Sequence, residues 1–474
     1  MAENWLVLKF GGTSVAGRSQ WETIASLAQA RQADGYRVLL VCSAVAGVTN
    51  RLMALTEQPH SKSIQAELLD LHRVLSEELN VNEKHWLQQA KLLMRERLDR
   101  LVSNPGPASN AGLLAMGEWL STQIGVRFLQ QSLNVGWVDA HEALEILEEG
   151  DLSPARRWLS ASCRPGPNPE LAEKWTKLNP ILLTQGFIAR TSDGETALLG
   201  RGGSDTSAAL LAGRLSAQRL EIWTDVPGLF SADPRLIPQA RLLRDVDYAE
   251  AQEMAASGAR VVHSRCIRAA AATNTPIVIR DTRRRHIEGT RIGESFSEGA
   301  GAKTITCQEK MTVLLLQNLD ARHQVGFLAR VFEIFKCRGI SVDLVATSET
   351  TTTVAINRET NHLAVGDLGP LITDLETCCK VEVFDPCVCV NLVGRGVRNA
   401  LSRMQKTMEI FEQRPLLMLS QSANDLCLSI LVQSGDHESL LRNAHQALIP
   451  GSDEAGSDLQ FGASWEQIIN SDPA

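Results

Sequence analysis

Residues 5 to 14 read Trp5-Leu6-Val7-Leu8-Lys9-Phe10-Gly11-Gly12-Thr13-Ser14, an apolar run that leads into a lysine, two glycines and two hydroxyls. The apolar run is typical of a buried β-strand. Where that strand ends, Gly11-Gly12 leaves two bare backbone N–H groups beside Lys9, which suits an anion that approaches the backbone closely. A plain tight turn explains the two glycines equally well. The lysine precedes the glycines, so the segment is not the phosphate loop that ends in Gly-Lys-Ser.

The composition is that of a globular protein with more than one domain. The chain has 474 residues, of which 44% are hydrophobic and 22% charged, with a net charge of −8. A chain of this length exceeds one hydrophobic core, so we expect two or three domains. The negative charge argues against a general nucleic-acid-binding protein. The short basic run at 283–285 is therefore interpreted as a solvated loop.

The sequence favours a protein of the cytoplasm. The N-terminus carries the acidic Glu3, unlike a signal peptide, and no stretch approaches the roughly 20 apolar residues of a membrane span. Ten cysteines without a disulfide-like framework suit a reducing compartment. The densest group lacks a paired Cys-x-x-Cys, and alternating valines favour reduced, half-buried cysteines in a strand over a zinc site. That group is Cys378, Cys379, Cys387 and Cys389.

Short apolar runs alternate with amphipathic segments over the first 300 residues. This alternation predicts an α/β layer fold with a mainly parallel sheet, in which ligands gather at the carboxyl ends of the strands. Residues 161–180 contain four prolines, which predict a long surface excursion. We expect strands over 5–9, 37–42, 181–189, 220–224 and 276–280, and helices over 204–215 and 247–256.

The pattern changes near Thr304 and indicates a duplicated unit of two small βαβ-type modules. We expect one domain over residues 1–300, the paired α+β modules over 304–460 and a tail or junction over 461–474. The first set has strands over 311–316, 340–345 and 351–356 and a helix over 326–338. The second set has strands over 388–393, 416–420 and 427–432 and helices over 399–412 and 438–448.

Four further segments combine small residues with hydroxyls or charges, several of them at strand ends. They are 43–50, Gly117-Glu118, 200–206 and 224–235. The glycine-rich segment at 200–203 opens the helix expected at Ser204, and helix N-termini stabilise anions. Each segment alone is better explained by a turn or a helix cap than by a binding site. Five of them in one α/β domain instead indicate a nucleotide-dependent site.

The order and spacing of these segments resemble the aspartokinases, which have the three-layer amino-acid kinase fold, along nearly the whole chain. In detail the chain is similar to the lysine-sensitive enzymes and to the kinase half of bifunctional aspartokinase/diaminopimelate decarboxylases. The resemblance implies ATP-dependent phosphorylation of the L-aspartate side chain to 4-phospho-L-aspartate, the entry to lysine, threonine and methionine biosynthesis. The matching motifs are Lys-Phe-Gly-Gly-Thr-Ser at 9–14, Ser-Ala-x-x-Gly-x-Thr-Asn at 43–50, Gly-Glu at 117–118, Gly-Arg-Gly-Gly-Ser-Asp at 200–205 and Thr-Asp-Val-Pro-Gly at 224–228.

The resemblance also implies residue roles, and the chemistry agrees with them. A carboxylate acceptor is already ionised, so the site must bring two anions together and neutralise their charge. Lys9 is expected at the transferring phosphoryl group, Arg201 at the α-carboxylate and Glu118 at the substrate ammonium. Asp205 either orients Lys9 or helps to bind the ammonium. Mg²⁺ is expected to arrive with ATP, held largely by phosphates and water.

The implied residues form three overlapping sets. The catalytic set is Lys9, Asp205 and Arg260. The aspartate-binding set is Thr49, Glu118, Arg201, Gly202, Gly203 and Ser204. The ATP-binding set is Lys9, Gly11, Gly12, Thr224, Asp225, Phe230, Arg235, Arg260 and Val261.

The chain departs from the family pattern in places. The usual Gly-Ala-Lys and His-Pro are Gly-Ala-Arg260 and His263-Ser264 here, and Phe230 replaces a common tyrosine. These changes keep open a catalytically weak relative that serves mainly as an amino-acid sensor. A kinase for glutamate or a nucleotide is disfavoured by the paired modules and by the segment at 200–205. Residues 461–465 resemble the junction of the fused enzymes, so we expect a single kinase or a separated half.

The C-terminal modules resemble paired ACT domains, which bind small amino acids and dimerise. Residues 322–328 and 341–349 match the effector segment of lysine-inhibited members, so the resemblance implies a lysine effector and a homodimer or larger homo-oligomer. Asp343 would supply the anion that a lysine ammonium needs, although Ser341 and Asp343 are also typical of a solvent-facing strand end. The implied effector set is His323, Gly326, Phe327, Leu328, Ser341, Val342, Asp343, Thr347, Ser348 and Glu349.

Overall fold

The structure of the chain is a computed structural model that describes residues 4–148, 153–259, 261–294, 301–317, 325–364, 366–398, 416–435, 437–449 and 460–471. It divides into two compact units, which are described separately. The first comprises Met1–Leu229, Arg244–Gln252 and Arg260–Phe296, and the second comprises Phe230–Leu243, Glu253–Ala259 and Ser297–Ala474. Two short segments from the first 300 residues thus pack with the C-terminal residues.

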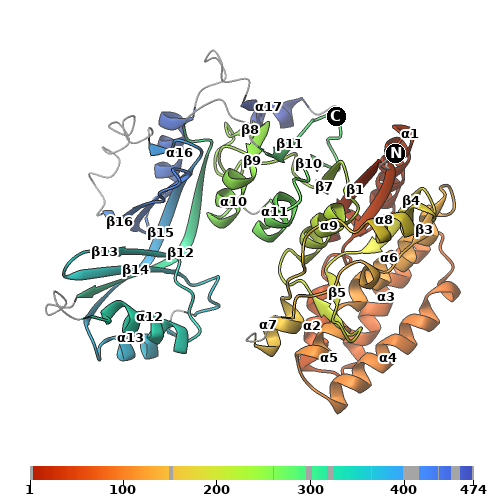
Figure 1. Ribbon diagram of the computed structural model, residues 1–474, viewed down its shortest axis with the longest axis horizontal. Helices are drawn as coiled ribbons and strands as arrows, with labels where there is room; N and C mark the ends of the chain where they lie inside the picture. Colours follow the sequence, from red (N-terminus) through yellow and green to blue (C-terminus); the bar gives the residue numbers. More distant parts are fainter. Residues whose placement is uncertain are drawn as a thin grey trace. The chain divides into compact units, whose positions relative to one another are not determined.

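A mainly parallel sheet of eight strands forms the centre of the first unit (Figure 1). The strand order is β3-β4-β2-β1-β7-β10-β11-β9, and only the β10–β11 pair is antiparallel. The expected α/β fold is therefore confirmed. The strands are β1 (Trp5–Phe10), β2 (Arg37–Cys42), β3 (Val135–Trp137), β4 (Ile181–Gln185), β7 (Arg219–Thr224), β9 (Asp245–Asp247), β10 (Ile277–Asp281) and β11 (Thr290–Gly293).

Helices cover both faces of this sheet and make three layers. Helices α1 (Arg18–Ala33) and α6 (Met116–Leu129) pack on one face, and α9 (Gly203–Arg214) packs on the other with α11 (Ser264–Ala271) against it. Two-sided cover explains why most side chains of β1, β2 and β4 are apolar and buried. The first layer is close-packed, because a Cβ on Gly125 of α6 would lie 1.9 Å from the ring of Trp21.

The remaining helices of the first unit lie in the connections between these strands. Four of them follow one another between β2 and α6 and appear in orange in Figure 1: α2 (Val48–Glu57), α3 (Lys62–Glu78), α4 (Leu87–Ser103) and α5 (Pro107–Leu114). The others are α7 (Pro154–Leu159), α8 (Pro169–Thr176) and the short 3₁₀ turns Gly12–Val15, Glu83–His85 and Ala140–Glu142. Helix α10 (Tyr248–Ala256) crosses from the first unit to the second.

One strand prediction in this unit is wrong. Residues 181–189 are not one strand, because β4 ends at Gln185 and Phe187 takes a positive φ of 69°. The chain then enters β5 (Ile188–Arg190), which pairs with β6 (Thr196–Leu198) in a separate hairpin. Residues 161–180, for which the prolines predict a surface excursion, are mostly exposed or half-exposed and include one helix, α8. Pro169 occupies the first turn of α8, where proline is favoured, and Asn168 caps that helix.

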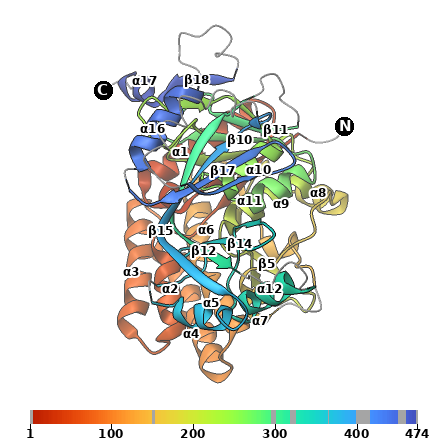
Figure 2. The same ribbon diagram turned by 90° about the vertical axis from the view of Figure 1, so that its left-hand side faces the viewer.

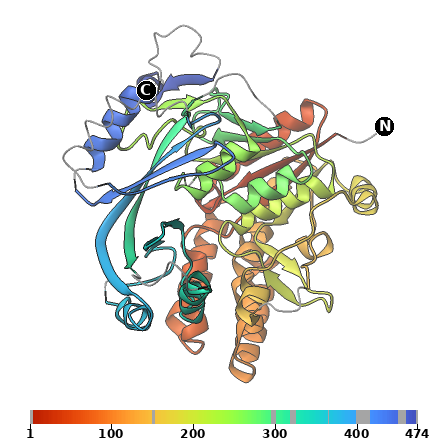
Figure 3. The ribbon, with the colours of Figure 1, turned by 60° about the vertical axis from the view of Figure 1, so that its left-hand side comes forward.

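The second unit contains a six-stranded antiparallel sheet in the order β13-β14-β12-β15-β17-β16. Its two central strands, β12 (Thr304–Gln317) and β15 (Lys380–Val393), are each 14 residues long and pair from one end to the other. Figures 2 and 3 show these two strands side by side. One half of the pair continues into β14 (Thr351–Asn357) and β13 (Leu344–Thr347), the other into β17 (Cys427–Gln433) and β16 (Leu416–Gln421). The two expected α+β modules are confirmed, and they share one sheet.

Three helices of this unit accompany the sheet: α12 (Phe327–Cys337), α13 (Gly369–Leu375) and α16 (His437–Leu448). Helix α13 was not expected, and the helix predicted over 399–412 lies outside the described residues. The strand predicted over 340–345 is displaced, since β13 begins only at Leu344. The backbone of Ser341 instead bonds with the Asn361 amide, donating to Oδ1 at 2.7 Å and accepting from Nδ2 at 3.0 Å.

The clustered cysteines of this unit contribute to its packing. Cys387 and Cys389 are buried on one face of β15 with Met311 and Leu431. Cys378 and Cys379 lie half-buried after α13. Across the described ranges no three His, Cys, Asp or Glu side chains are grouped as metal ligands would be. Among the same residues, no helix is both long enough and apolar enough to cross a bilayer.

The last described residues pair with a segment from the middle of the chain. Strand β18 (Phe461–Ser464) lies antiparallel to β8 (Arg241–Leu243), and α17 (Trp465–Asn470) follows it. The Arg241 guanidinium donates to the carbonyl oxygens of Phe461 and Gly462 at 3.3 and 3.1 Å. The Trp465 ring packs edge to face on Phe230, with 5.7 Å between ring centroids. These contacts lie within the second unit.

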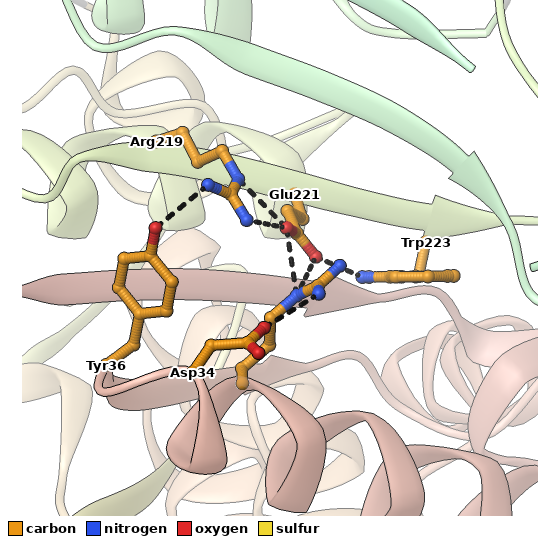
Figure 4. A network of polar contacts seen from close by, with 6 residues as sticks. Asp34, Tyr36, Arg219, Glu221 and Trp223 are labelled. Atoms are coloured by element: carbon orange, nitrogen blue, oxygen red, sulfur yellow. Dashed lines mark hydrogen bonds and ion pairs between the residues drawn. The ribbon is translucent and has the colours of Figure 1, made fainter. Parts of the chain in front are cut away.

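A buried charge network joins α1 to the sheet of the first unit (Figure 4). The fully buried Glu221 carboxylate on β7 accepts from Nε and Nη2 of Arg219 at 2.9 and 2.7 Å. Arg31 of α1 and the Trp223 indole donate to the same carboxylate at 3.2 and 3.1 Å. Arg219 also lies over the Tyr36 ring, 5.3 Å from its centroid. Both oxygens of this carboxylate therefore accept hydrogen bonds, as a buried charge requires.

We expect Glu221→Gln to lower the free energy of unfolding by about 3 kcal/mol, because it leaves two largely buried guanidinium groups without their carboxylate. Chemical denaturation monitored by tryptophan fluorescence measures this. The matched control is Glu22→Gln, which removes the exposed Arg18–Glu22 pair and should change stability by less than about 0.5 kcal/mol. Equal small losses for the two variants would contradict a central role for the network.

Candidate active site

A cavity of about 390 Å³ opens in the first unit, at the carboxyl ends of β1, β2 and β4. This is where a parallel α/β sheet places its ligands. Parallel neighbours end at the same edge, so segments far apart in sequence meet there. The cavity is lined by Lys9, Gly11, Gly12, Ser43, Ala44, Val45, Ala46, Gly47, Thr49, Asn50, Glu118, Phe187, Gly200, Gly202, Gly203, Ser204 and Asp205.

The paired glycines after β1 allow two loops to touch. A Cβ on Gly12 would lie 2.8 Å from the carbonyl oxygen of Ala44, so no larger residue fits there. The Ala46 N–H donates to the Gly12 carbonyl at 3.2 Å, which ties the loop after β2 to the loop after β1. At Gly11, a Cβ would lie 3.6 Å from Lys9 Nζ. Gly11 therefore lies beside the lysine head group, where a Cβ would be at ordinary contact distance.

Lys9 forms an ion pair with Asp205, which lies in the first turn of α9. Their side chains are only 11% and 15% exposed, so solvent screens the pair weakly. The contact joins β1 to the helix on the opposite side of the cavity. Of the two roles expected for Asp205, orientation of Lys9 is the one this geometry favours.

Glu118 supplies a buried carboxylate at the cavity. It is 3% exposed, its Oε1 accepts the Ala44 N–H at 3.2 Å, and its Oε2 is without a partner among the described residues. Burial raises the pKa of Glu118 to about 8, against the lowering effect of the Ala44 hydrogen bond. A buried acceptor left open beside a cavity suits a cationic group that a ligand brings.

The glycine-rich segment at 200–203 leads into α9 on the other side of the cavity. Gly200 and Gly202 both have positive φ, 72° and 67°, which glycine adopts without strain. The first turn of α9 lines the cavity with Gly203, Ser204 and Asp205, and helix N-termini stabilise anions. Arg201 is exposed and does not line the cavity, unlike the residues on either side of it. Thr49 lies at the start of α2 and lines the cavity as expected.

The residues implied for ATP are divided between the two units. Thr224 ends β7, its hydroxyl donates to Asp225 at 3.1 Å, and both residues belong to the first unit with the half-buried Val261. Phe230 and Arg235 belong to the second unit. There Phe230 packs on Trp465, as described above, and Arg235 is paired with Asp233. Arg260 lies outside the described residues, and of the ATP set only Lys9, Gly11 and Gly12 line the cavity.

The residues implied for the effector lie in three parts of the second unit. Gly326 has a φ of 97° and caps α12, so that Phe327 and Leu328 form its first turn. Asp343 lies just before β13. Its carboxylate accepts the Asn357 N–H at 2.7 Å, while partial desolvation raises its pKa. Ser341 and Val342 precede it, and Thr347, Ser348 and Glu349 lie at the turn into β14. His323 is outside the described residues.

One cavity residue was missed by the sequence analysis. Phe187 lines the cavity, and its backbone N–H donates to the Ser207 hydroxyl of α9 at 3.1 Å. Its positive φ follows from a break after β4. The glycine at 186 was the sequence signal for a break in the strand. In the structure a Cβ at this position would lie 2.7 Å from Ser204 Cβ.

Comparisons with known proteins agree with this geometry. The amino acid kinase family matches residues 4–281. Lysine-sensitive aspartokinase 3 of Escherichia coli is 30% identical over 462 residues, which cover 94% of this chain and 99% of that enzyme. Two crystal structures of the E. coli aspartokinase III, one with aspartate and ADP and one with lysine and aspartate, are 28% and 29% identical to this chain. Each superposes with a TM-score of 0.76, covering 94% of this chain and all of the other. The chain therefore belongs to the amino acid kinase family and, within it, to the aspartokinases.

Proposed function

We propose that this protein transfers the γ-phosphoryl group of ATP to the side-chain carboxylate of L-aspartate, giving 4-phospho-L-aspartate and ADP. One observation carries the proposal: a single cavity presents a cation, Lys9, and the buried carboxyl group of Glu118, whose Oε2 has no partner among the described residues. An amino acid with an anionic side chain matches both groups. The E. coli relative, with aspartate and ADP in its structure, supports the same substrates.

The reaction needs charge neutralisation more than acid–base chemistry. The aspartate carboxylate is ionised at neutral pH, so its oxygen attacks the γ-phosphorus without a general base. The bond from that phosphorus to the bridging oxygen breaks, and ADP leaves with the electron pair. Lys9 offsets the charge shared by the two anions, and Asp205 holds the lysine in place. Backbone N–H groups at Gly11 and Gly12 supply further donors.

Aspartate is held by groups that match its two ends. Glu118 pairs with the substrate ammonium, and Arg201 grips the α-carboxylate with its planar fork. Hydroxyls of Thr49 and Ser204 add contacts, and the bare backbone of Gly202 and Gly203 allows a close approach. Arg201 lies outside the cavity lining, so this assignment requires its flexible side chain to turn toward bound substrate.

ATP binding extends beyond the described cavity. Thr224, Asp225, Phe230, Arg235 and Val261, together with Arg260, are proposed for the nucleotide, which brings Mg²⁺ on its phosphates. We propose that the enzyme works in the cytoplasm as a homodimer or larger homo-oligomer formed through its ACT modules. These assignments rest on the sequence resemblance described above.

Regulation by lysine follows from the second unit. The E. coli relative is named lysine-sensitive, and one of its structures holds lysine with aspartate. Asp343 is proposed to bind a lysine ammonium, since it is an anion with one carboxylate oxygen, Oδ2, engaged by a backbone N–H. Inhibition requires lysine to favour an inactive arrangement, typically by about 1–3 kcal/mol.

The first prediction tests the chemistry. Wild-type protein should release ADP from ATP in a coupled assay only when aspartate is added. Lys9→Met should lower that turnover by a factor on the order of 10² to 10³, because it removes the cation at the transferring group. Lys62→Met, at an exposed position at the start of α3, should leave turnover unchanged.

Two results would contradict this assignment. Turnover of Lys9→Met above about a tenth of wild type would exclude Lys9 from the reaction. A wild-type protein that binds amino acids without releasing ADP would be the sensor alternative instead. Glutamate and UMP, tested in the same assay, distinguish the other kinases of this fold.

The second prediction follows from the raised pKa of Glu118. Below pH 8 its carboxyl is largely protonated and neutral, so it cannot pair with the ammonium. The KM for aspartate should therefore fall by a factor on the order of ten between pH 6.5 and 8.5. Glu118→Gln should raise this KM and flatten its pH dependence. The KM for ATP, measured in the same series, is the control; parallel changes in both constants would contradict the assignment.

The third prediction concerns lysine. Asp343→Asn keeps an oxygen that can accept the Asn357 N–H but removes the charge. It should raise the lysine concentration for half-inhibition by about 30-fold or more, with uninhibited turnover preserved. Asp367→Asn is matched, because Asp367 also accepts a nearby backbone N–H, from Ala364 at 2.7 Å, yet lies outside the effector set. Equal inhibition curves for both variants would place the effector elsewhere.

A further inference from the structure

Arg265, in the first turn of α11, contacts two separate segments of the first unit, residues 160–162 and Leu199. Its Nη1 donates to the carbonyl of Leu199 and to the Ser160 hydroxyl, the latter at 3.3 Å. Its Nη2 donates to the carbonyl of Ala161 and to the Ser162 hydroxyl, the latter at 3.5 Å. A planar guanidinium can reach both segments at once, which a point charge such as lysine cannot do. One side chain thus ties residues 160–162 to the residue just before Gly200.

The loop that follows Leu199 packs against residues that Arg265 contacts. A Cβ on Gly200 would lie 2.7 Å from the Ser160 hydroxyl, and one on Gly202 would lie 2.4 Å from His263 Cγ. His263 is held in turn, since its Nδ1 accepts the Arg265 N–H at 3.2 Å and caps α11. Gly200 therefore packs against Ser160 and Gly202 against His263, and both of these residues are hydrogen-bonded to Arg265.

The electrostatics of Arg265 are unusual for a residue that only packs. No carboxylate pairs with its guanidinium among the described residues, and carbonyl and hydroxyl oxygens are its partners. Burial, together with the nearby Arg268, lowers the pKa of Arg265. An apolar side chain would fill the space without this desolvation cost. The presence of an arginine at this half-buried position is therefore explained by its hydrogen bonds to residues 160–162 and Leu199, which hold the two segments together.

We propose that Arg265 is a positioning residue for aspartate binding, which fixes the backbone at 199–200 and thereby aims Arg201 and the cavity-lining residues Gly202–Ser204. The inference rests on the proposed function, in which this loop binds the substrate. It also gives the segment after Val261 a second role: α11 begins where the segment implied for ATP ends, and its first turn holds the aspartate loop.

Steady-state kinetics of Arg265→Lys test the proposal. The lysine keeps the charge and loses the fork, so the KM for aspartate should rise at least tenfold while the KM for ATP stays within about twofold. Arg268→Lys, on an exposed position of the same helix, is the matched control and should behave as wild type. Methylguanidinium should restore part of the aspartate affinity to Arg265→Ala, because a free guanidinium can occupy the space that the arginine head group leaves.

Double-mutant kinetics provide a sharper test. If Arg265 acts through Arg201, then Arg201→Lys combined with Arg265→Lys should raise the aspartate KM no further than the worse single variant. Additive effects would mean that the two arginines act separately and would overturn the proposal.

Hydrogen exchange of the substrate-free protein tests the positioning without relying on activity. Amides at 199–204 should exchange at least tenfold faster in Arg265→Lys than in wild type, with unchanged exchange in the β1, β2 and β4 strands. Unchanged exchange at 199–204 would overturn the inference even in an active enzyme. Faster exchange there in a wild-type-folded protein that never phosphorylates aspartate would keep the positioning role and refute the proposed function alone.

Discussion

The parallel pairing of β1 with β2 and β7 is the constraint on which the site depends. Phe10 is in register with Cys42 on one side and Trp223 on the other, so the three strands end together. Chain direction alone then places the segments that follow them at one edge of the sheet. An antiparallel neighbour at either position would send one of these segments to the opposite edge. The cavity exists because the strands agree in direction.

Closeness of the loops at that edge is the second requirement. Ala44 lies against both Gly12 and Gly117, where a Cβ would come within 2.8 and 2.7 Å of its oxygen and its methyl group. Small residues therefore let the loop after β2 lie between β1 and α6, which brings the Glu118 carboxylate to the Ala44 N–H. The same tight packing removes Glu118 from water and raises its pKa. The close packing around Ala44 thus both shapes the site and raises the pKa of its carboxyl group.

The second unit is organised around a different constraint, the shared pair of long strands. Because β12 and β15 run through both modules, neither module has a sheet of its own. The second unit also includes residues Phe230–Leu243, which directly follow the segment at 224–229. The Ser231 hydroxyl is bonded to His445 of α16 at 2.8 Å, and the Ile305 N–H donates to the Ser231 carbonyl at 2.8 Å. Phe230 and Arg235, two of the residues implied for the nucleotide, thus belong to the same unit as the residues implied for the effector.

Local patterns in the sequence were enough to predict the strands β1, β2, β7 and β10, the mainly parallel sheet and the gathering of Lys9, Thr49 and Glu118 at one site. These features follow from hydrophobic periodicity and from strand direction. Three other features became visible in the folded chain: the steric reason for glycine at Gly12, the pairing of Asp205 with Lys9, and the division of residues 181–189 into two strands. The tertiary structure alone revealed the Glu221 network and the hold of Arg265 on residues 160–162 and 199. The reason is physical: each of these depends on contacts between residues far apart in the chain, and no local pattern encodes which distant groups will meet.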